Sequence, residues 1–123
     1  MKSNWQEGLK IWRRDRNITI PSGKVAEMLN EELDELKVAI IEKDNYETID
    51  ALCDLIVLAT NELELMGYDL DTVMVETVKE ISSRRQCPIQ KIEWDKGLIS
   101  GKWTKDRSQT DTYKARYVEA YRS

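Results

Sequence analysis

Two clusters of acidic residues contain the side chains of this sequence that could support a reaction. In chain order the acids are Glu31, Glu32, Glu35, Asp50 and Asp54. The sequence has no histidine and no glycine-rich phosphate loop of the GxxxxGK[ST] or GxGxxG type. These absences argue against Ser-His-Asp hydrolases, most zinc hydrolases and di-iron proteins that need histidine ligands. Oxygen ligands alone favour a hard divalent cation, for which Mg²⁺ is the natural candidate.

Helical spacing places the acids of the first cluster beside an apolar stripe. At 3.6 residues per turn, Glu31, Glu32 and Glu35 fall within about 100° of arc, and Glu32 is the closest to the stripe. A run of glutamates is usually a solvated helix face, so this cluster alone does not indicate a site.

The second cluster differs because Asp54 lies in the middle of the apolar segment 51–59. Asp50, Asp54 and Asn61 share a helix face through steps of four and seven residues, and Glu47 lies at its edge. An ionised carboxylate in apolar surroundings needs a partner. A metal shared with the first cluster is one solution, and a core ion pair of Asp54 with Arg or Lys is the alternative.

Long helices must position these acids. Apolar residues recur at steps of three and four from Val25 to Ile40, which predicts a helix of about five turns after Pro21. A break at 43–45 leads into a second helix that Asp44 caps and Gly67 ends. Its middle, 51–59, is apolar on almost every side, which predicts burial all round.

Two further helices are expected, a short one over about 5–16 and another from Asp69 or Asp71 to about Arg85. From Cys87 the periodicity weakens, which indicates an irregular arm. We therefore expect one all-α domain over 1–123, with a helical core at about 22–86 and an arm at about 87–123. Cys53 is expected to be an ordinary buried thiol.

Composition narrows the possible partners and location. The chain of 123 residues is 41% apolar and 34% charged, which is typical of a folded protein with a charged surface. Its net charge of −4 argues against nucleic acid as the main partner. No apolar run approaches the roughly 20 residues that span a bilayer, and the N-terminus lacks the apolar block of a signal peptide. The expected location is cytoplasmic, without a membrane partner.

The acidic motifs resemble those of the MazG-like, all-α NTP pyrophosphatase superfamily, whose signature is EExxE on one helix and ExxD on the next. Residues 31–35 match the first half, and 50–54 offer two acids four residues apart. Glu47 with Asp50 keeps the literal ExxD spacing, but Asp50 and Asp54 are preferred because of the apolar surroundings of Asp54. The resemblance implies Mg²⁺, with Mn²⁺ as a substitute, held by Glu32, Glu35, Asp50 and Asp54, with Glu31 as an outer or additional ligand.

The resemblance also implies a nucleotide-binding role for residues beyond the second cluster. Segments 83–84 and 101–105 are similar to phosphate-facing segments of the superfamily, although Ile81 stands where an asparagine is expected. The residues implied are Arg84, Lys102, Lys105 and Tyr113, and Asn61 is a further candidate because it shares a helix face with Asp50 and Asp54. For each, an ordinary surface or packing role is the alternative.

A helix hairpin alone cannot cover its apolar surface, and members of the superfamily pair hairpins into four-helix bundles. The resemblance thus implies a homodimer or homotetramer. It implies cleavage of nucleoside triphosphates to monophosphate and pyrophosphate. Two alternatives stay open at this point, a non-catalytic helical module that binds a nucleotide or partner, and a related enzyme for another substrate such as phosphoribosyl-ATP. The preferred base, and the choice of deoxyribose or ribose, cannot be inferred from the residues.

Overall fold

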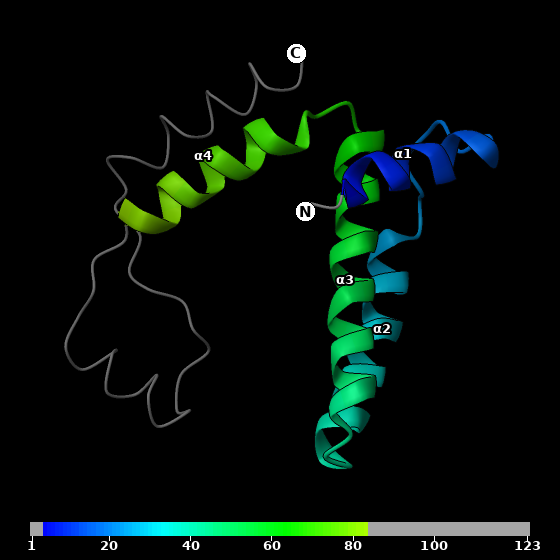
Figure 1. Cartoon of the computed structure of the whole chain (residues 1–123), viewed down its shortest axis with the longest axis vertical. Helices are drawn as coiled ribbons and strands as arrows, with labels where there is room; N and C mark the ends of the chain where they lie inside the picture. The colour runs from blue at the N-terminus through cyan, green and yellow to red at the C-terminus, as the bar shows by residue number, and fades with distance from the viewer. Residues whose placement is uncertain (1–3, 84–123) are drawn as a thin grey trace. The chain divides into compact units, whose positions relative to one another are not determined.

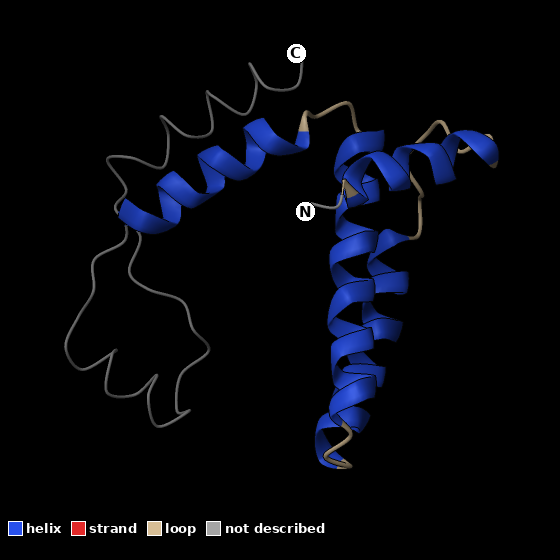
Figure 2. Ribbon diagram, viewed as in Figure 1, coloured by secondary structure: helices blue, strands red, loops and turns tan. Residues whose placement is uncertain are grey.

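The computed structural model describes residues 4–83, and this part of the chain contains four helices and no strand (Figures 1 and 2). They are α1 (Trp5–Asp15), α2 (Val25–Ile41), α3 (Asn45–Leu65) and α4 (Leu70–Ser83). The all-α class predicted from the sequence is confirmed. The chain divides after Gly67 into two compact units, of which the first holds α1 to α3 and the second holds α4.

A tight turn joins α2 and α3 into an antiparallel hairpin (Figure 1). Lys43 adopts a left-handed conformation with φ of 56°. The amide of Asp44 donates to the carbonyl of Ala39 at 2.9 Å, and the amide of Lys43 donates to the carbonyl of Ile40 at 3.1 Å. These two hydrogen bonds satisfy backbone carbonyls at the end of α2. The Asp44 side chain then accepts from the amide of Glu47 at 3.0 Å and caps α3. The predicted helix break and cap are therefore both present.

The end of α3 and the start of α4 also follow the predicted signals. Gly67 has φ of 97°, a conformation that favours glycine, and its amide donates to the carbonyl of Glu64 at 3.0 Å. Asp69 accepts hydrogen bonds from the amide of Thr72, at 3.2 Å, and from the Thr72 hydroxyl. Helix α4 is described as far as Ser83, and the predicted end near Arg85 lies outside the described residues.

The predicted N-terminal helix is present as α1. Asn4 caps it by accepting from the amide of Glu7 at 3.1 Å. Asn17, with φ of 55°, ends it, and the amide of Ile18 donates to the carbonyl of Arg13 at 3.0 Å. The loop that follows is tied to α3, because the amide of Ser22 donates to Glu62 Oε2 at 3.2 Å.

The apolar core of the first unit is thin. Its fully buried apolar residues are small, Ala39 on α2 and Ala51 on α3. Leu52 is 46% exposed, Ile56 is 56% exposed, and Cys53 is also exposed. The prediction that segment 51–59 is buried on all sides is therefore wrong for a single chain, because one neighbouring helix can cover only one face of α3. The same reason explains the exposed thiol of Cys53.

The uncovered side of α3 carries a continuous apolar strip. Ile49, Leu52 and Ile56 follow one another at steps of three and four residues, and all three are exposed. We call these three residues the α3 strip. Over residues 4–83, no helix has the length and apolar character needed to cross a membrane.

Candidate active site

The carboxylate of Glu32 lies at the centre of the acidic cluster. Its Oε2 atom is enclosed and has no hydrogen-bond partner among residues 4–83. The pKa of Glu32 is raised from 4.5 to about 7, first by burial, then by its interaction with Glu35 and by the negative charges of Asp54 and Asp50. Of the four acids proposed as the main metal ligands, the other three are thus close enough to act on Glu32.

The hairpin accounts for this arrangement. Glu32 and Glu35 stand three residues apart on α2, and Asp50 and Asp54 stand four apart on α3, so each pair lies on one face of its helix. The antiparallel packing of α2 against α3 turns the two faces toward each other. The turn at Lys43 and Asp44 fixes which residues lie opposite one another.

An open groove of about 660 Å³ continues from the cluster toward the hairpin turn. Its acidic lining residues are Asp34, Glu35, Glu42, Glu47 and Asp50. The sequence analysis placed Glu47 at the edge of the site and did not include Asp34 or Glu42. Glu42 stands seven residues after Glu35, a spacing that repeats the same helix face and could have identified it.

A hard cation fits this set of side chains by its chemistry. The donors are all carboxylate oxygens, and the enclosed, unpartnered Oε2 of Glu32 is the kind of atom that a cation satisfies. Within the described part of the chain, however, no three carboxylate or thiol groups are arranged around a single ion. In the same part, no Lys or Arg forms a salt bridge with Asp54, so the core ion pair considered as an alternative is not observed there.

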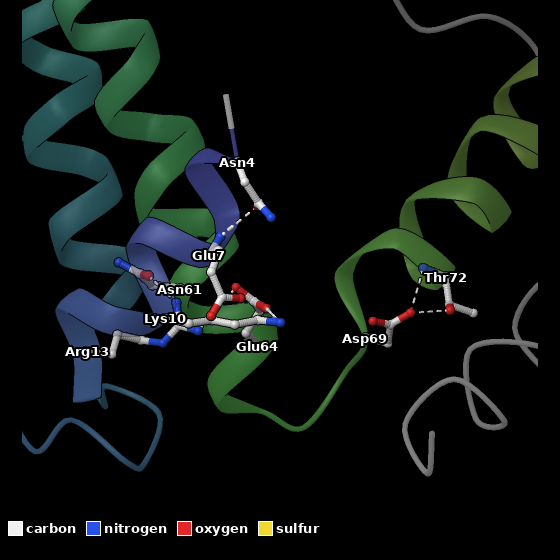
Figure 3. A network of polar contacts seen from close by, with 8 residues as sticks. All are labelled: Asn4, Glu7, Lys10, Arg13, Asn61, Glu64, Asp69 and Thr72. Carbon is white, nitrogen blue, oxygen red and sulfur yellow. Dashed lines mark hydrogen bonds and ion pairs between the residues drawn. The ribbon is translucent and has the colours of Figure 1, made fainter. Parts of the chain in front are cut away.

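Two other predicted residues lie elsewhere. Glu31 is exposed and does not line the groove, so its role as an additional ligand stays a prediction. Asn61 lies toward α1, where its Oδ1 accepts from Arg13 Nη1 at 2.6 Å (Figure 3). Arg13 Nη2 also contacts Glu64 Oε1 at 3.2 Å, and the Arg13 side chain is only 8% exposed. The sequence analysis did not identify Arg13, since nothing local marks a contact across 48 positions.

A second, more enclosed pocket of about 160 Å³ lies between α1, α2 and α3. Its lining is mostly apolar and includes Trp12, Val25, Met28, Leu58, Asn61 and Leu65. We call it the α1 pocket. Of the phosphate-side and base-side residues implied by the resemblance, Arg84, Lys102, Lys105 and Tyr113 lie outside the described residues.

Comparison with known families places these features in context. The sequence model of the phosphoribosyl-ATP pyrophosphohydrolase family matches residues 13–80, more than half of the chain and the whole acidic cluster. The chain belongs to the phosphoribosyl-ATP pyrophosphohydrolase family. This family is part of the MazG-like all-α NTP pyrophosphatase superfamily, so the resemblance based on the acidic motifs is confirmed. Membership indicates a pyrophosphohydrolase that acts on nucleotide triphosphates. Comparisons with curated proteins and with solved structures give no match.

Proposed function

We propose that this member of the phosphoribosyl-ATP pyrophosphohydrolase family is a Mg²⁺-dependent enzyme that hydrolyses nucleoside triphosphates to monophosphate and pyrophosphate. The observation that supports the proposal most directly is the enclosed Glu32 carboxylate, on which Glu35, Asp50 and Asp54 act. Placing the Glu32 carboxylate in an enclosed position beside three other acids lowers stability when it is charged, and such a cost is typical of a functional site.

In the proposed reaction, the oxygen of a water molecule bonds to the α-phosphorus and the bond to the α–β bridging oxygen breaks. Pyrophosphate leaves with that bridging oxygen, and a proton is released to solvent. Glu32, Glu35, Asp50 and Asp54 would hold the cation, with Mn²⁺ as a substitute for Mg²⁺. When bound, the metal neutralises phosphate oxygens and lowers the pKa of water. By their positions on the hairpin, the carboxylates would set where the cation and the triphosphate bind.

The remaining predicted groups complete the proposal. Arg84, Lys102 and Lys105 would neutralise the charge that develops on pyrophosphate as it leaves. Tyr113 would contact the nucleotide. We further propose that the enzyme works as a homodimer or homotetramer, because the hairpin that carries the acids leaves the α3 strip uncovered.

The activity is tested by incubating the full chain with each of the eight common ribo- and deoxyribonucleoside triphosphates in Mg²⁺ and separating the products. We expect monophosphate and pyrophosphate, and no orthophosphate. Glu35→Gln and Asp54→Asn should each lower kcat/KM by at least about a hundredfold, because each removes a charged metal ligand. Their helical circular dichroism should be unchanged, and their Mg²⁺ affinity should fall.

Glu47→Gln is the matched control. It removes a carboxylate from the same groove but not from the proposed ligand set, so its effect on kcat/KM should be mild. Near-normal activity of both Glu35→Gln and Asp54→Asn would contradict the ligand assignment. If Glu47→Gln strongly lowered kcat/KM and Asp54→Asn lowered it only mildly, the ligand role would be assigned to Glu47 and not to Asp54.

The family match favours a second candidate substrate, phosphoribosyl-ATP. Both substrates present the same phosphoanhydride to the same acids. The acidic cluster alone therefore does not indicate which of the two is the substrate. Values of kcat/KM measured side by side for phosphoribosyl-ATP and the simple triphosphates decide between them. Metal binding without hydrolysis of any of these substrates would instead favour a non-catalytic nucleotide-binding module.

A further inference from the structure

We propose that the α1 pocket binds the base of the nucleotide and admits a single-ring pyrimidine in preference to a purine. The inference rests on the proposed function, because it assigns the other end of the same substrate. It draws on the position of the pocket, its volume and lining, and the orientation of one amide.

The pocket begins one helical turn from the acids on both helices of the hairpin. Met28 lines it and stands four residues before Glu32 on α2, and Leu58 lines it and stands four residues after Asp54 on α3. Four residues advance an α-helix by about 6 Å. This spacing leaves room for a sugar between a phosphate held at the acids and a base held in the pocket.

The acidic groove extends from the cluster in the opposite direction. Its lining residues Glu42 and Glu47 flank the hairpin turn, whereas the α1 pocket is at the far end of the hairpin. A nucleotide with its reacting phosphate at the acids therefore lies lengthwise on the hairpin. Its pyrophosphate end points toward the turn, and its base points toward α1.

The volume of the pocket suits one aromatic ring. At about 160 Å³ it is close to the engineered cavity of about 150 Å³ that accommodates benzene. The fused rings of a purine need more space. Trp12 offers an aromatic surface on which a base can stack, and the Arg16 guanidinium, 4.6 Å from the centre of the Trp12 ring, helps to hold that ring in place.

Asn61 supplies a polar contact of defined orientation. Arg13 has only donors, so the Asn61 atom that it contacts must be the amide oxygen. Arg13 is itself buried and held by Glu64, which fixes this choice (Figure 3). The Asn61 NH₂ group is then the part left to pair with a ligand, and it requires an acceptor. Each common pyrimidine carries such an acceptor in its C2 carbonyl.

The test is equilibrium binding of nucleoside monophosphates to the full chain by isothermal titration calorimetry, which needs no catalysis. We expect dCMP, dUMP or dTMP to bind at least about tenfold more tightly than dAMP and dGMP, since a site sized for one ring excludes the second. The corresponding triphosphates should show the same order in kcat/KM. Equal or tighter binding of the purines overturns the proposal, as does the absence of binding of every monophosphate up to about 1 mM.

Two variants test whether the α1 pocket is the site at which a pyrimidine base binds. Leu58→Phe fills it, and should raise the Kd for pyrimidine monophosphates and the KM for the triphosphates at least about tenfold, with a smaller change in kcat. Asn61→Asp keeps the contact to Arg13 but replaces the free donor by an acceptor, and should weaken pyrimidine binding similarly. Unchanged pyrimidine binding by a folded Asn61→Asp protein would place the base elsewhere.

Matched substitutions outside the pocket serve as controls. Ile20→Phe adds a ring at a loop residue that is 74% exposed, and Asn45→Asp makes the same amide change near the hairpin turn. Neither should alter nucleotide binding.

Failure of the proposed function and failure of this inference are distinguishable. The first appears as bound nucleotide without hydrolysis, and the second as hydrolysis without pyrimidine preference.

Discussion

Glu32 combines two properties that a protein normally keeps apart, an enclosed position and acidic neighbours. With its pKa raised to about 7, first by burial and then by Glu35, Asp54 and Asp50, it is largely protonated in mildly acidic solution and largely charged above neutrality. The charged form has no counter-charge in the isolated hairpin. In the metal-free protein, the charged carboxylate lowers the free energy of unfolding. A bound cation would offset this loss.

The stability of the metal-free protein should therefore depend on pH through Glu32. The folded-state pKa of Glu32 is raised above 4.5. The contribution of its protonated form to the free energy of unfolding is therefore fully present below about pH 4.5 and is lost as the pH rises through about 7. Glu32→Gln removes this loss, and the variant should gain stability relative to the natural protein as the pH rises from 4.5 to 8. Urea unfolding followed by circular dichroism in EDTA measures the difference.

Mg²⁺ provides the control for this pH experiment. At pH 8 it should stabilise the natural protein more than Glu32→Gln, because the proposed site would hold the cation through the charged carboxylate. A stability difference between the two proteins that stays constant from pH 4.5 to 8 would contradict the assigned cause.

At this scale, the sequence predicted what local spacing determines. Glu35, Asp50 and Asp54 were identified from helical periodicity and from the apolar neighbours of Asp54, and the structure brings them to Glu32. The contact between Arg13 and Asn61 could not be predicted, because it depends on how α1 docks against α3. Asn61 was expected on the acidic face, but its side chain is held toward α1.

At the level of elements, the turn between α2 and α3 is the part most fully specified by local sequence. Asp44 ends one helix with its amide and begins the next with its side chain. Asp44→Ala should lower the free energy of unfolding by about 1 kcal/mol, within a usual range of about 0.5–2, because it removes the cap of α3. Chemical denaturation measures this loss.

Glu27→Ala is a suitable comparison for the cap variant. Glu27 is an exposed acid in the first turn of α2 but is not its cap, so its removal should change stability by less than about 0.5 kcal/mol. If both variants were as stable as the natural protein, the Asp44 cap would contribute nothing measurable.

The misprediction at this scale concerns α3. An all-round apolar segment indicates a buried helix, but it does not say what buries it. Leu52 and Ile56 are exposed because, among the described helices, α2 is the main neighbour of this stretch and covers one side of α3. The pattern correctly identifies an apolar surface and leaves open whether the same chain covers it.

For the whole molecule, the α3 strip leads to a prediction about self-association. If a second copy covers Ile49, Leu52 and Ile56, the purified protein should sediment as a dimer or tetramer of the 14.4 kDa chain. Ile56→Arg places a charge in that contact and should shift the protein toward monomer. Sedimentation velocity at micromolar concentration measures both.

Ile20→Arg makes the same change at an exposed loop residue outside the α3 strip and should leave the assembly intact. A natural protein that sediments as a monomer at micromolar concentration would contradict the proposed oligomer. An Ile56→Arg protein that associates as fully as the natural one would place the contact on another surface.

At this scale the sequence predicted the helical class and the superfamily, because both follow from helical periodicity and the acidic motifs. The expectation of one domain over 1–123 stays a prediction, and the two units that meet after Gly67 were not anticipated. The roles of Arg84, Lys102, Lys105 and Tyr113 depend on long-range placement that spacing does not encode.

The ion pair of Arg13 with Glu64 limits how far the chain can be shortened without opening the α1 pocket. A fragment that started at α2 would retain every carboxylate of the acidic cluster and would look sufficient from the motif alone. It would also lose the Arg13 guanidinium that contacts Asn61 and Glu64, and one wall of the α1 pocket would be open. The first helix, which carries none of the acids, would thus be as much a component of the proposed nucleotide site as the two helices that do.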